Sequence, residues 1–89
     1  MTQVEEQGPL VAGETSLLIV DDEANLRNQL AKAMERRGFA TEVAESVSEG
    51  KRAVALNPPK YAVIDLRLVD GSGLEVVEAL REARPDARI

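Results

Sequence analysis

Cysteine, histidine and tryptophan are all absent from the sequence. Without cysteine, the chain has no disulfide framework and no thiolate metal site. Without histidine, it lacks the most common general base, the most common zinc ligand and any Ser-His catalytic arrangement. The absence of cysteine also fits a cytoplasmic protein. Any metal chemistry of this chain therefore relies on oxygen ligands.

Aromatic residues, basic runs and long apolar runs are scarce as well. Phe39 and Tyr61 are the only aromatic residues, and no run approaches the roughly 20 apolar residues of a membrane-spanning helix. A net charge of −5 without a basic run argues against direct nucleic-acid binding. We also expect no signal peptide and no membrane partner, because the N-terminus lacks a positive region followed by an apolar one.

The sequence does contain enough apolar surface for one small domain. Its 89 residues are 44% hydrophobic, which is too apolar for a wholly disordered chain. Residues 1–14 include Gly8, Pro9 and Gly13 and show no periodicity, so we expect a flexible leader there, or alternatively a partner-binding tail. The domain is expected over residues 15–89.

Apolar runs and helical stripes alternate along residues 15–89, which predicts a parallel sheet with right-handed crossovers. The predicted elements are strand 17–20, helix 23–37, strand 39–44, helix 47–56, strand 61–65, a helix from 74 to before Pro85, and the start of a strand at 87–89. Capping boxes are expected at 46–49 and 72–75. The helical residues expected to face the core are Leu26, Leu30, Ala33, Met34, Val47, Ala53, Val54, Leu74, Val77 and Leu80.

Two of the predicted strands run directly into acidic residues. Asp21 and Asp22 follow the first strand, and Asp65 ends the third. A carboxylate is costly inside a strand covered on both faces, so these acids belong at the carboxyl ends. In the flavodoxin-like strand order 2-1-3, the first and third strands are neighbours and ligands bind at their carboxyl ends. We therefore expect the three carboxylates to meet in one crevice.

Three carboxylates within a few ångströms repel one another and require a cation or a proton. Mg²⁺ suits such a site, because it prefers carboxylate, water and phosphate oxygens. A carboxylate beside Mg²⁺ can also attack phosphorus and form an aspartyl phosphate. Each acid taken alone has an ordinary alternative, since an Asp pair often caps a helix and an Asp after a strand is often a turn residue.

These stretches closely resemble the receiver domain of bacterial two-component response regulators. The matching residues are the runs 17–23 (LLIVDDE) and 61–68 (YAVIDLRL), together with Gly73. The runs 33–39 (AMERRGF) and 70–78 (DGSGLEVVE) are most similar to the redox-responsive RegA/PrrA/ActR group. The likeness covers residues 16–89. It implies an α/β fold of the flavodoxin-like (CheY-like) type, truncated after the third helix.

The resemblance also implies roles for the acidic residues. Asp65 would be the phosphoacceptor, taking a phosphoryl group from a sensor histidine kinase, and would also bind Mg²⁺. Asp22 would be a direct Mg²⁺ ligand and Asp21 a ligand acting largely through water, with the backbone carbonyl of Arg67 completing the protein's share. The chain would thus be a phosphoacceptor receiver domain of a transcriptional response regulator, and not an enzyme.

Other features of the family are expected beyond Ile89. These are the hydroxyl and the lysine that stabilise the phosphoryl group, the face that many receivers use to dimerise, and the DNA-binding domain of this group. We therefore expect weak or absent phosphorylation of this stretch alone, with weak Mg²⁺ binding retained. The outer edge of strand 61–65 would be bare, which favours self-association or a swapped strand.

Two other functions are left open by the residues themselves. A Mg²⁺-dependent phosphohydrolase would also use an Asp nucleophile, although many such enzymes place a second Asp two residues later, where this chain has Arg67. A degenerate receiver could act as a phosphorylation-independent interaction module, but all three acids are present here.

Overall fold

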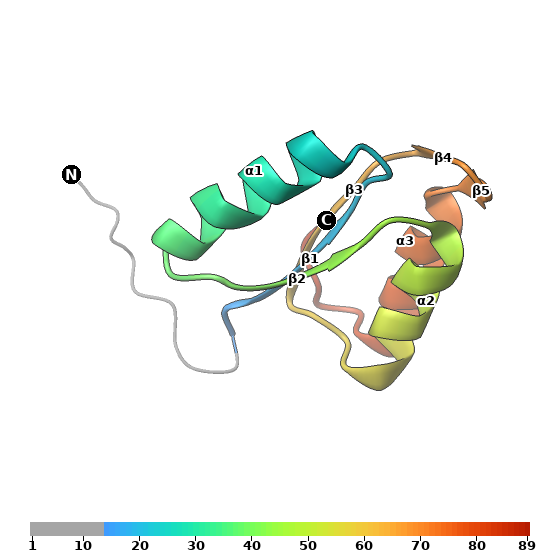
Figure 1. Cartoon of the computed structure of the whole chain (residues 1–89). Coiled ribbons are helices and arrows are strands. Elements are labelled where there is room, and N and C mark those ends of the chain that lie inside the picture. Colours follow the sequence, from blue (N-terminus) through green and yellow to red (C-terminus); the bar gives the residue numbers. More distant parts are fainter. Residues whose placement is uncertain (1–13) are drawn as a thin grey trace.

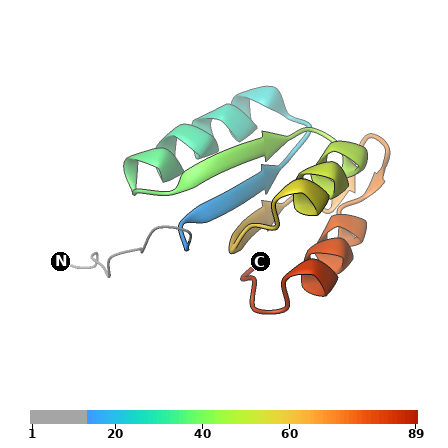
Figure 2. The same ribbon diagram turned by 90° about the horizontal axis from the view of Figure 1, so that it is seen from below.

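A parallel sheet separates one helix from a pair of helices in the computed structural model, which describes residues 14–89 (Figures 1 and 2). The strands of this sheet are β1 (Ser16–Val20), β2 (Ala40–Ala44) and β3 (Tyr61–Ile64). A short antiparallel hairpin, β4 (Arg67–Leu68) and β5 (Gly71–Ser72), stands apart from it. The helices are α1 (Ala24–Arg36), α2 (Val47–Leu56) and α3 (Leu74–Ala83). Helix α1 lies alone on one face of the sheet, and α2 and α3 lie side by side on the other (Figure 2).

The central strand of the sheet is β1, in the order β2-β1-β3, and both of its pairings are parallel. This is the order predicted from the sequence, and the flavodoxin-like fold class is confirmed. Val20 lies opposite Ala44 of β2 and Ile64 of β3, so the three strands end at the same level. Strand β2 begins one residue later than predicted, because the Phe39 N–H still donates to the Met34 carbonyl at the end of α1 (3.1 Å). The Phe39 ring packs edge-on against Tyr61, with ring centroids 5.4 Å apart.

The main core lies between the sheet and the α2–α3 pair. Leu18 and Val20 of β1 are no more than 1% exposed and join the same buried cluster as Val76 and Leu80 of α3. Gly50 allows α2 to approach closely, because a Cβ there would lie 3.0 Å from a Val76 methyl carbon and 3.3 Å from one of Val20. The absence of a side chain at this position therefore fits the close packing of α2 against α3 and β1.

The expected core face of α1 is only partly realised. None of its residues is fully buried, and Leu26 is 54% exposed, so the predicted inward position of Leu26 is wrong. Leu26 lies in the first turn of α1, near the point where the strands end (Figure 1). No second helix of the described chain shares this face, and Val43 and Val63 of the sheet remain 43% and 45% exposed.

The buried face of α3 is shifted from the predicted one. Val76 and Leu80 are fully buried, whereas Leu74 is 53% exposed and Val77 only half-buried. Leu80 was predicted correctly, Leu74 was assigned the wrong environment, and Val77 is buried only in part. The reason lies in the docking of α3, since it packs on α2 through Val76 opposite Gly50.

One of the two expected capping boxes forms in part. Ser46 Oγ accepts a hydrogen bond from the Glu49 N–H (3.1 Å), while the Glu49 carboxylate accepts one from the Glu45 N–H (3.1 Å), one residue earlier than in a regular box. The second predicted box does not form. Gly73 occupies the N-cap of α3 without a side-chain bond, and Ser72 Oγ accepts from the Leu74 N–H at 3.1 Å.

The predicted leader lies outside the described residues except for its last member, Glu14. The Glu14 carboxylate is ion-paired with Lys60 (3.9 Å) and Arg84 (3.3 Å). Glu14 is therefore held against the folded domain.

The predicted strand start at 87–89 is present as a single parallel bridge between Arg88 and Tyr61. The Arg88 N–H donates to the Lys60 carbonyl (2.8 Å), and the Ala62 N–H donates to the Arg88 carbonyl (2.9 Å). The outer edge of β3, which was expected to be bare, is thus covered over its first residues. Among the helices of residues 14–89, none has the length and apolar character required to cross a membrane.

Candidate metal centre

The predicted acidic residues follow neighbouring strands at the same level of the sheet. Asp21 and Asp22 come directly after β1, and Asp65 comes directly after β3. The strand ladders continue one residue past each strand, because the Asp21 N–H donates to the Ala44 carbonyl (3.0 Å) and the Asp65 N–H donates to the Val20 carbonyl (2.9 Å). The backbone of both strand ends is therefore fixed by the sheet.

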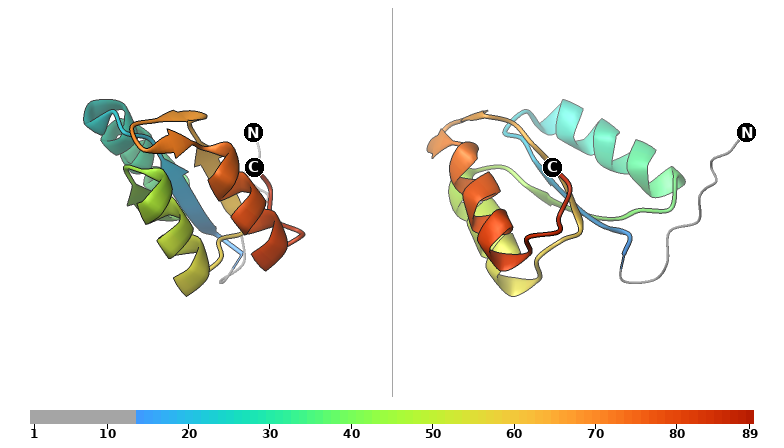
Figure 3. Two further views of the ribbon diagram at one scale, coloured as in Figure 1. Left: turned by 90° about the vertical axis from the view of Figure 1, so that its right-hand side faces the viewer. Right: turned by 180° about the vertical axis from the view of Figure 1, so that it is seen from behind.

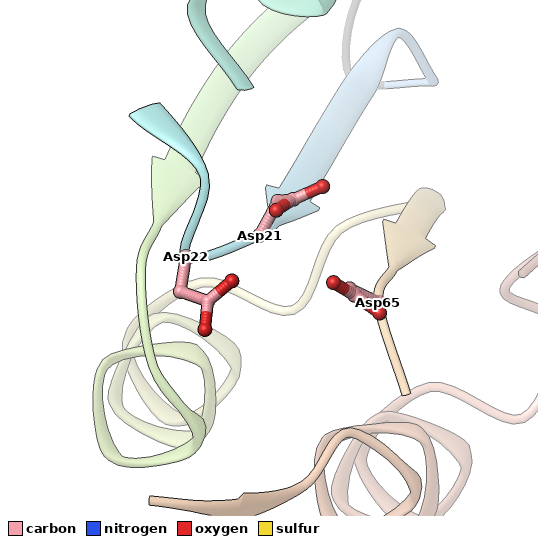
Figure 4. A group of neighbouring side chains, drawn as sticks. All are labelled: Asp21, Asp22 and Asp65. Atoms are coloured by element: carbon pink, nitrogen blue, oxygen red, sulfur yellow. The ribbon is translucent and has the colours of Figure 1, made fainter. Parts of the chain in front are cut away.

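The structure brings the three predicted carboxylates together (Figure 4). One oxygen from each of Asp21, Asp22 and Asp65 lies within 4.8 Å of the other two. Asp21 and Asp65 are half-buried and Asp22 is exposed. In Figure 4 the Asp22 and Asp65 side chains extend toward the space between the two strand ends. A concentration of negative charge with access to solvent results.

Contacts with the start of α1 fix the position of Asp21, and Asp21 is not the N-cap of that helix. Its Oδ1 accepts from the Glu23 N–H (2.9 Å), and its backbone carbonyl accepts from Arg27 Nη1 (2.9 Å). The N-cap of α1 is Glu23, whose carboxylate accepts from the Leu26 N–H at 2.8 Å. The alternative interpretation of the Asp pair as a helix cap is therefore wrong.

Asp65 is held by the loop that follows it. Its Oδ1 accepts from the Arg67 N–H (3.1 Å), which is the local bond that the turn-residue alternative predicts. A carboxylate has about four acceptor sites, so this bond leaves capacity for a metal or a phosphoryl group. Gly73 lies against the same residue, because a Cβ on Gly73 would collide with the Asp65 backbone carbonyl. The Gly73 N–H also donates to the Leu66 carbonyl (3.0 Å).

Sequence reasoning missed the supporting roles of Arg27 and Gly73. Arg27 is not among the residues predicted to face the core, and its bond to the Asp21 carbonyl was not expected. Gly73 was noted as part of the resemblance, without the close approach that explains it. Arg67 lies two residues after Asp65 as the first residue of β4, and the role of its carbonyl as a ligand stays a prediction.

The donor set fits a hard divalent cation. All three groups are carboxylates, which are ligands that Mg²⁺ and Ca²⁺ prefer. Two oxygens bound directly to one Mg²⁺ lie at most about 4.2 Å apart, given bond lengths of about 2.1 Å. The outer limit of 4.8 Å is slightly larger, so a small side-chain rotation or one bridging water would complete the fit. A bound cation would also relieve the repulsion among the three charges.

Comparison with known proteins identifies relatives that are named as regulatory proteins. Residues 17–89 match the model of the response regulator receiver domain. The photosynthetic apparatus regulatory protein RegA of Rhodobacter capsulatus is 60% identical over 96% of this chain and 46% of its own length. The acid tolerance regulatory protein ActR of Rhizobium meliloti is 58% identical over 90% of this chain and 41% of its own length. The chain thus spans less than half the length of these relatives.

A solved structure shows the same likeness in three dimensions. It is a response regulator protein from Burkholderia pseudomallei with a phosphorylated aspartic acid, a calcium ion and citrate. Its TM-score is 0.79 at 32% identity, over 84% of this chain and 44% of that one. Strand order and the match over residues 17–89 agree with this likeness, and we conclude that the chain belongs to the response regulator receiver domain family.

Proposed function

We propose that this chain is the phosphoacceptor part of a two-component response regulator, with Asp65 as the acceptor. The observation that carries the proposal is the meeting of Asp21, Asp22 and Asp65 within 4.8 Å at neighbouring strand ends, in a chain of this family. Membership of the receiver family supports a sensor histidine kinase as the donor. The phosphohistidine then belongs to the kinase, so this chain needs no histidine of its own. Residues 15–89 form the N-terminal part of the receiver domain.

In the transfer step, an Asp65 carboxylate oxygen attacks the phosphorus of the kinase's phosphohistidine. A P–O bond forms, the P–N bond breaks, and its electron pair returns to the imidazole of the kinase. Asp21, Asp22 and Asp65, with the Arg67 carbonyl, would hold Mg²⁺, which when bound neutralises charge on the phosphoryl oxygens. The Arg67 N–H orients the nucleophile through its bond to Asp65 Oδ1 (3.1 Å).

The names of the relatives support a regulatory output. RegA and ActR are regulatory proteins, and the KdpE protein of Escherichia coli, 37% identical over 76% of this chain, is a transcriptional regulator. We infer that the parent protein regulates transcription. We expect no direct DNA contact by these 89 residues, because their net charge is −5 and they contain no basic run.

Phosphorylation with a small phosphodonor tests this function. The chain and its parent reading frame are incubated with acetyl phosphate, with and without Mg²⁺, and analysed on a phosphate-affinity gel. We expect acid-stable, Mg²⁺-dependent labelling of the parent that Asp65→Asn abolishes, and weaker labelling of the 89-residue chain. Labelling that persists in Asp65→Asn would refute Asp65 as the acceptor.

No observation favours the phosphohydrolase alternative, because Arg67 occupies the position where a second Asp would act.

Self-association through the partly covered outer edge of β3 is a further part of the proposal. The backbone pairing of this edge ends at Ala62, whose N–H donates to the Arg88 carbonyl. Val63 and Ile89 directly follow these two residues, and each is 45% exposed.

A further inference from the structure

The tip of the β4–β5 hairpin contacts the N-terminus of α2. Asp70, in the turn of the hairpin, accepts from the Val47 N–H through Oδ1 (2.7 Å) and from the Ser48 N–H through Oδ2 (3.1 Å). These partners lie 23 and 22 residues away in the sequence. The contact therefore ties together two segments that are distant in the chain. Figure 3 shows the hairpin lying over the ends of α2 and α3.

Helix α2 also has a local cap of its own. Ser46 Oγ accepts from the Glu49 N–H, and the Gly50 N–H already donates to the Ser46 carbonyl. The N–H groups of Val47 and Ser48 are the remaining donors of the first turn, and Asp70 takes both. The carboxylate charge is favourable at this end of the helix dipole. The Val47 N–H, and next the Ser48 N–H, lower the pKa of the Asp70 carboxyl, so the contact is made by the charged form.

The other end of the hairpin begins at the acceptor. Arg67, its first residue, donates its N–H to Asp65 Oδ1 and pairs with Ser72 across the hairpin. Leu68, opposite Gly71, is buried in the main core. Gly71, which follows Asp70 in the turn, has φ of 148°, a conformation that favours glycine. A short, hydrogen-bonded path thus leads from Asp65 to α2.

We propose that Asp70 is a positioning residue that anchors the acceptor loop on α2 and couples occupation of the Asp65 site to the first turn of that helix. The coupling to occupation rests on the proposed function of Asp65, whereas the anchoring does not. Coupling between two sites is reciprocal. Mg²⁺ binding should therefore tighten the Asp70–α2 contact, and loss of that contact should weaken Mg²⁺ binding.

Hydrogen exchange followed by NMR tests the anchoring in the metal-free chain. We expect Asp70→Ala to accelerate exchange of the Val47 and Ser48 amides and of the Arg67 amide in the acceptor loop. Asp70→Asn, which keeps one acceptor oxygen, should give an intermediate change. Ser46→Ala is the matched control, since it weakens the same helix end without touching the hairpin, and should leave Arg67 unchanged. Equal exchange at Arg67 in the Asp70→Ala and Ser46→Ala variants would overturn the anchoring.

Mg²⁺ titration of the same variants tests the coupling. We expect Asp70→Ala to weaken Mg²⁺ binding by about fivefold, the lower end of typical coupling between sites, with Asp70→Asn in between. Ser46→Ala and the distant Asp86→Ala should bind like the original chain. An unchanged affinity in Asp70→Ala would overturn the coupling. If the original chain bound no Mg²⁺, the proposed function and the coupling would fail together, while the exchange experiment would still decide the anchoring.

Discussion

Gly73 contacts the backbone of the loop that follows Asp65. Its N–H reaches the Leu66 carbonyl, and its missing side chain leaves room for the Asp65 carbonyl. The acceptor loop therefore depends on a residue eight positions after the proposed acceptor. The acids could be predicted from the sequence because each follows a strand. The contacts of Asp70 with residues 22 and 23 positions away depend on tertiary packing, and those of Arg27 and Gly73 depend on the exact course of the loops after β1 and β3.

Substitution of Gly73 by Ala should damage both stability and the metal site. The new Cβ would collide with backbone, which cannot yield as a side-chain end does, so we expect a loss of at least about 2 kcal/mol. Gly38→Ala is the control, because its space is open and only its φ of 98° is unfavourable, at about 1–2 kcal/mol. Urea unfolding and Mg²⁺ titration of both variants check this. Undiminished Mg²⁺ affinity in Gly73→Ala would contradict a close supporting role.

Two surface carboxylates give the chain a defined response to acid. Hydrogen bonds from the Val47 and Ser48 amides lower the pKa of Asp70, and the hydrogen bond from Lys60 lowers the pKa of Asp86. Because these folded-state pKa values are lowered, the stability that each group contributes is complete above its unfolded pKa and is lost as the pH falls through its folded pKa.

We therefore expect the urea midpoint to fall as the pH is lowered below about 4, where unfolded carboxyl groups begin to bind protons. Asp70→Asn and Asp86→Asn should each reduce this pH dependence. The comparison is the difference in midpoint between pH 7 and pH 3 for each variant. A variant whose difference equals that of the original chain would show that its carboxylate does not contribute.

The elements themselves were largely predictable from the sequence. The bounds of α2 agree with the prediction because Ser46 and the Asn-Pro-Pro run at 57–59 mark its ends locally. The face that each helix buries was harder to predict, since it depends on the neighbour. Val76 is buried because α3 packs on Gly50 of α2, and α1 buries no residue because it is alone on its face. The β4–β5 hairpin was missed, since it has only two residues in each strand.

The two adjacent valines of α3 give a matched test of its docking. Val76 is 0% exposed and Val77 half-buried. We expect Val76→Ala to cost about 2–3 kcal/mol of unfolding free energy, the value of a fully buried valine, and Val77→Ala less than about 1 kcal/mol. Urea unfolding followed by circular dichroism measures both. The reverse order would show that α3 docks through the face predicted from the sequence alone.

At the scale of the whole molecule, the apolar surface is distributed unevenly. The α2–α3 face of the sheet holds the main core, while the α1 face leaves Val43 and Val63 more than 40% exposed. Within residues 14–89, the outer edge of β3 is paired through a single bridge at Arg88. The meeting of the three acids was predictable because the alternation of strands and helices indicates a parallel sheet, in which the flavodoxin-like order makes the first and third strands neighbours. The exposed edge of the sheet was predicted, but the bridge of Arg88 to Tyr61 that covers part of it was not.

We expect this chain to self-associate at moderate concentration. Exposed apolar surface beside a partly open strand edge favours pairing with a second copy. Light scattering from about 10 to 500 μM should show a rising mass, and Val63→Lys should reduce it, whereas Glu78→Lys on α3 should not. A monomer at every concentration would contradict the expectation.

The most direct test of a metal site at Asp21, Asp22 and Asp65 is an NMR titration of this chain with Mg²⁺. We predict saturable shifts that are largest at the amides of residues 21–23 and 65–67, with smaller shifts at the Asp70–α2 contact. Asp22→Asn should weaken binding at least about tenfold, as is typical even for supporting residues of metal sites. Glu78→Gln, which removes the same charge from α3, should leave the affinity unchanged. Shifts that fail to saturate, or that spread equally to Glu78 and Asp86, would contradict a metal site formed by Asp21, Asp22 and Asp65.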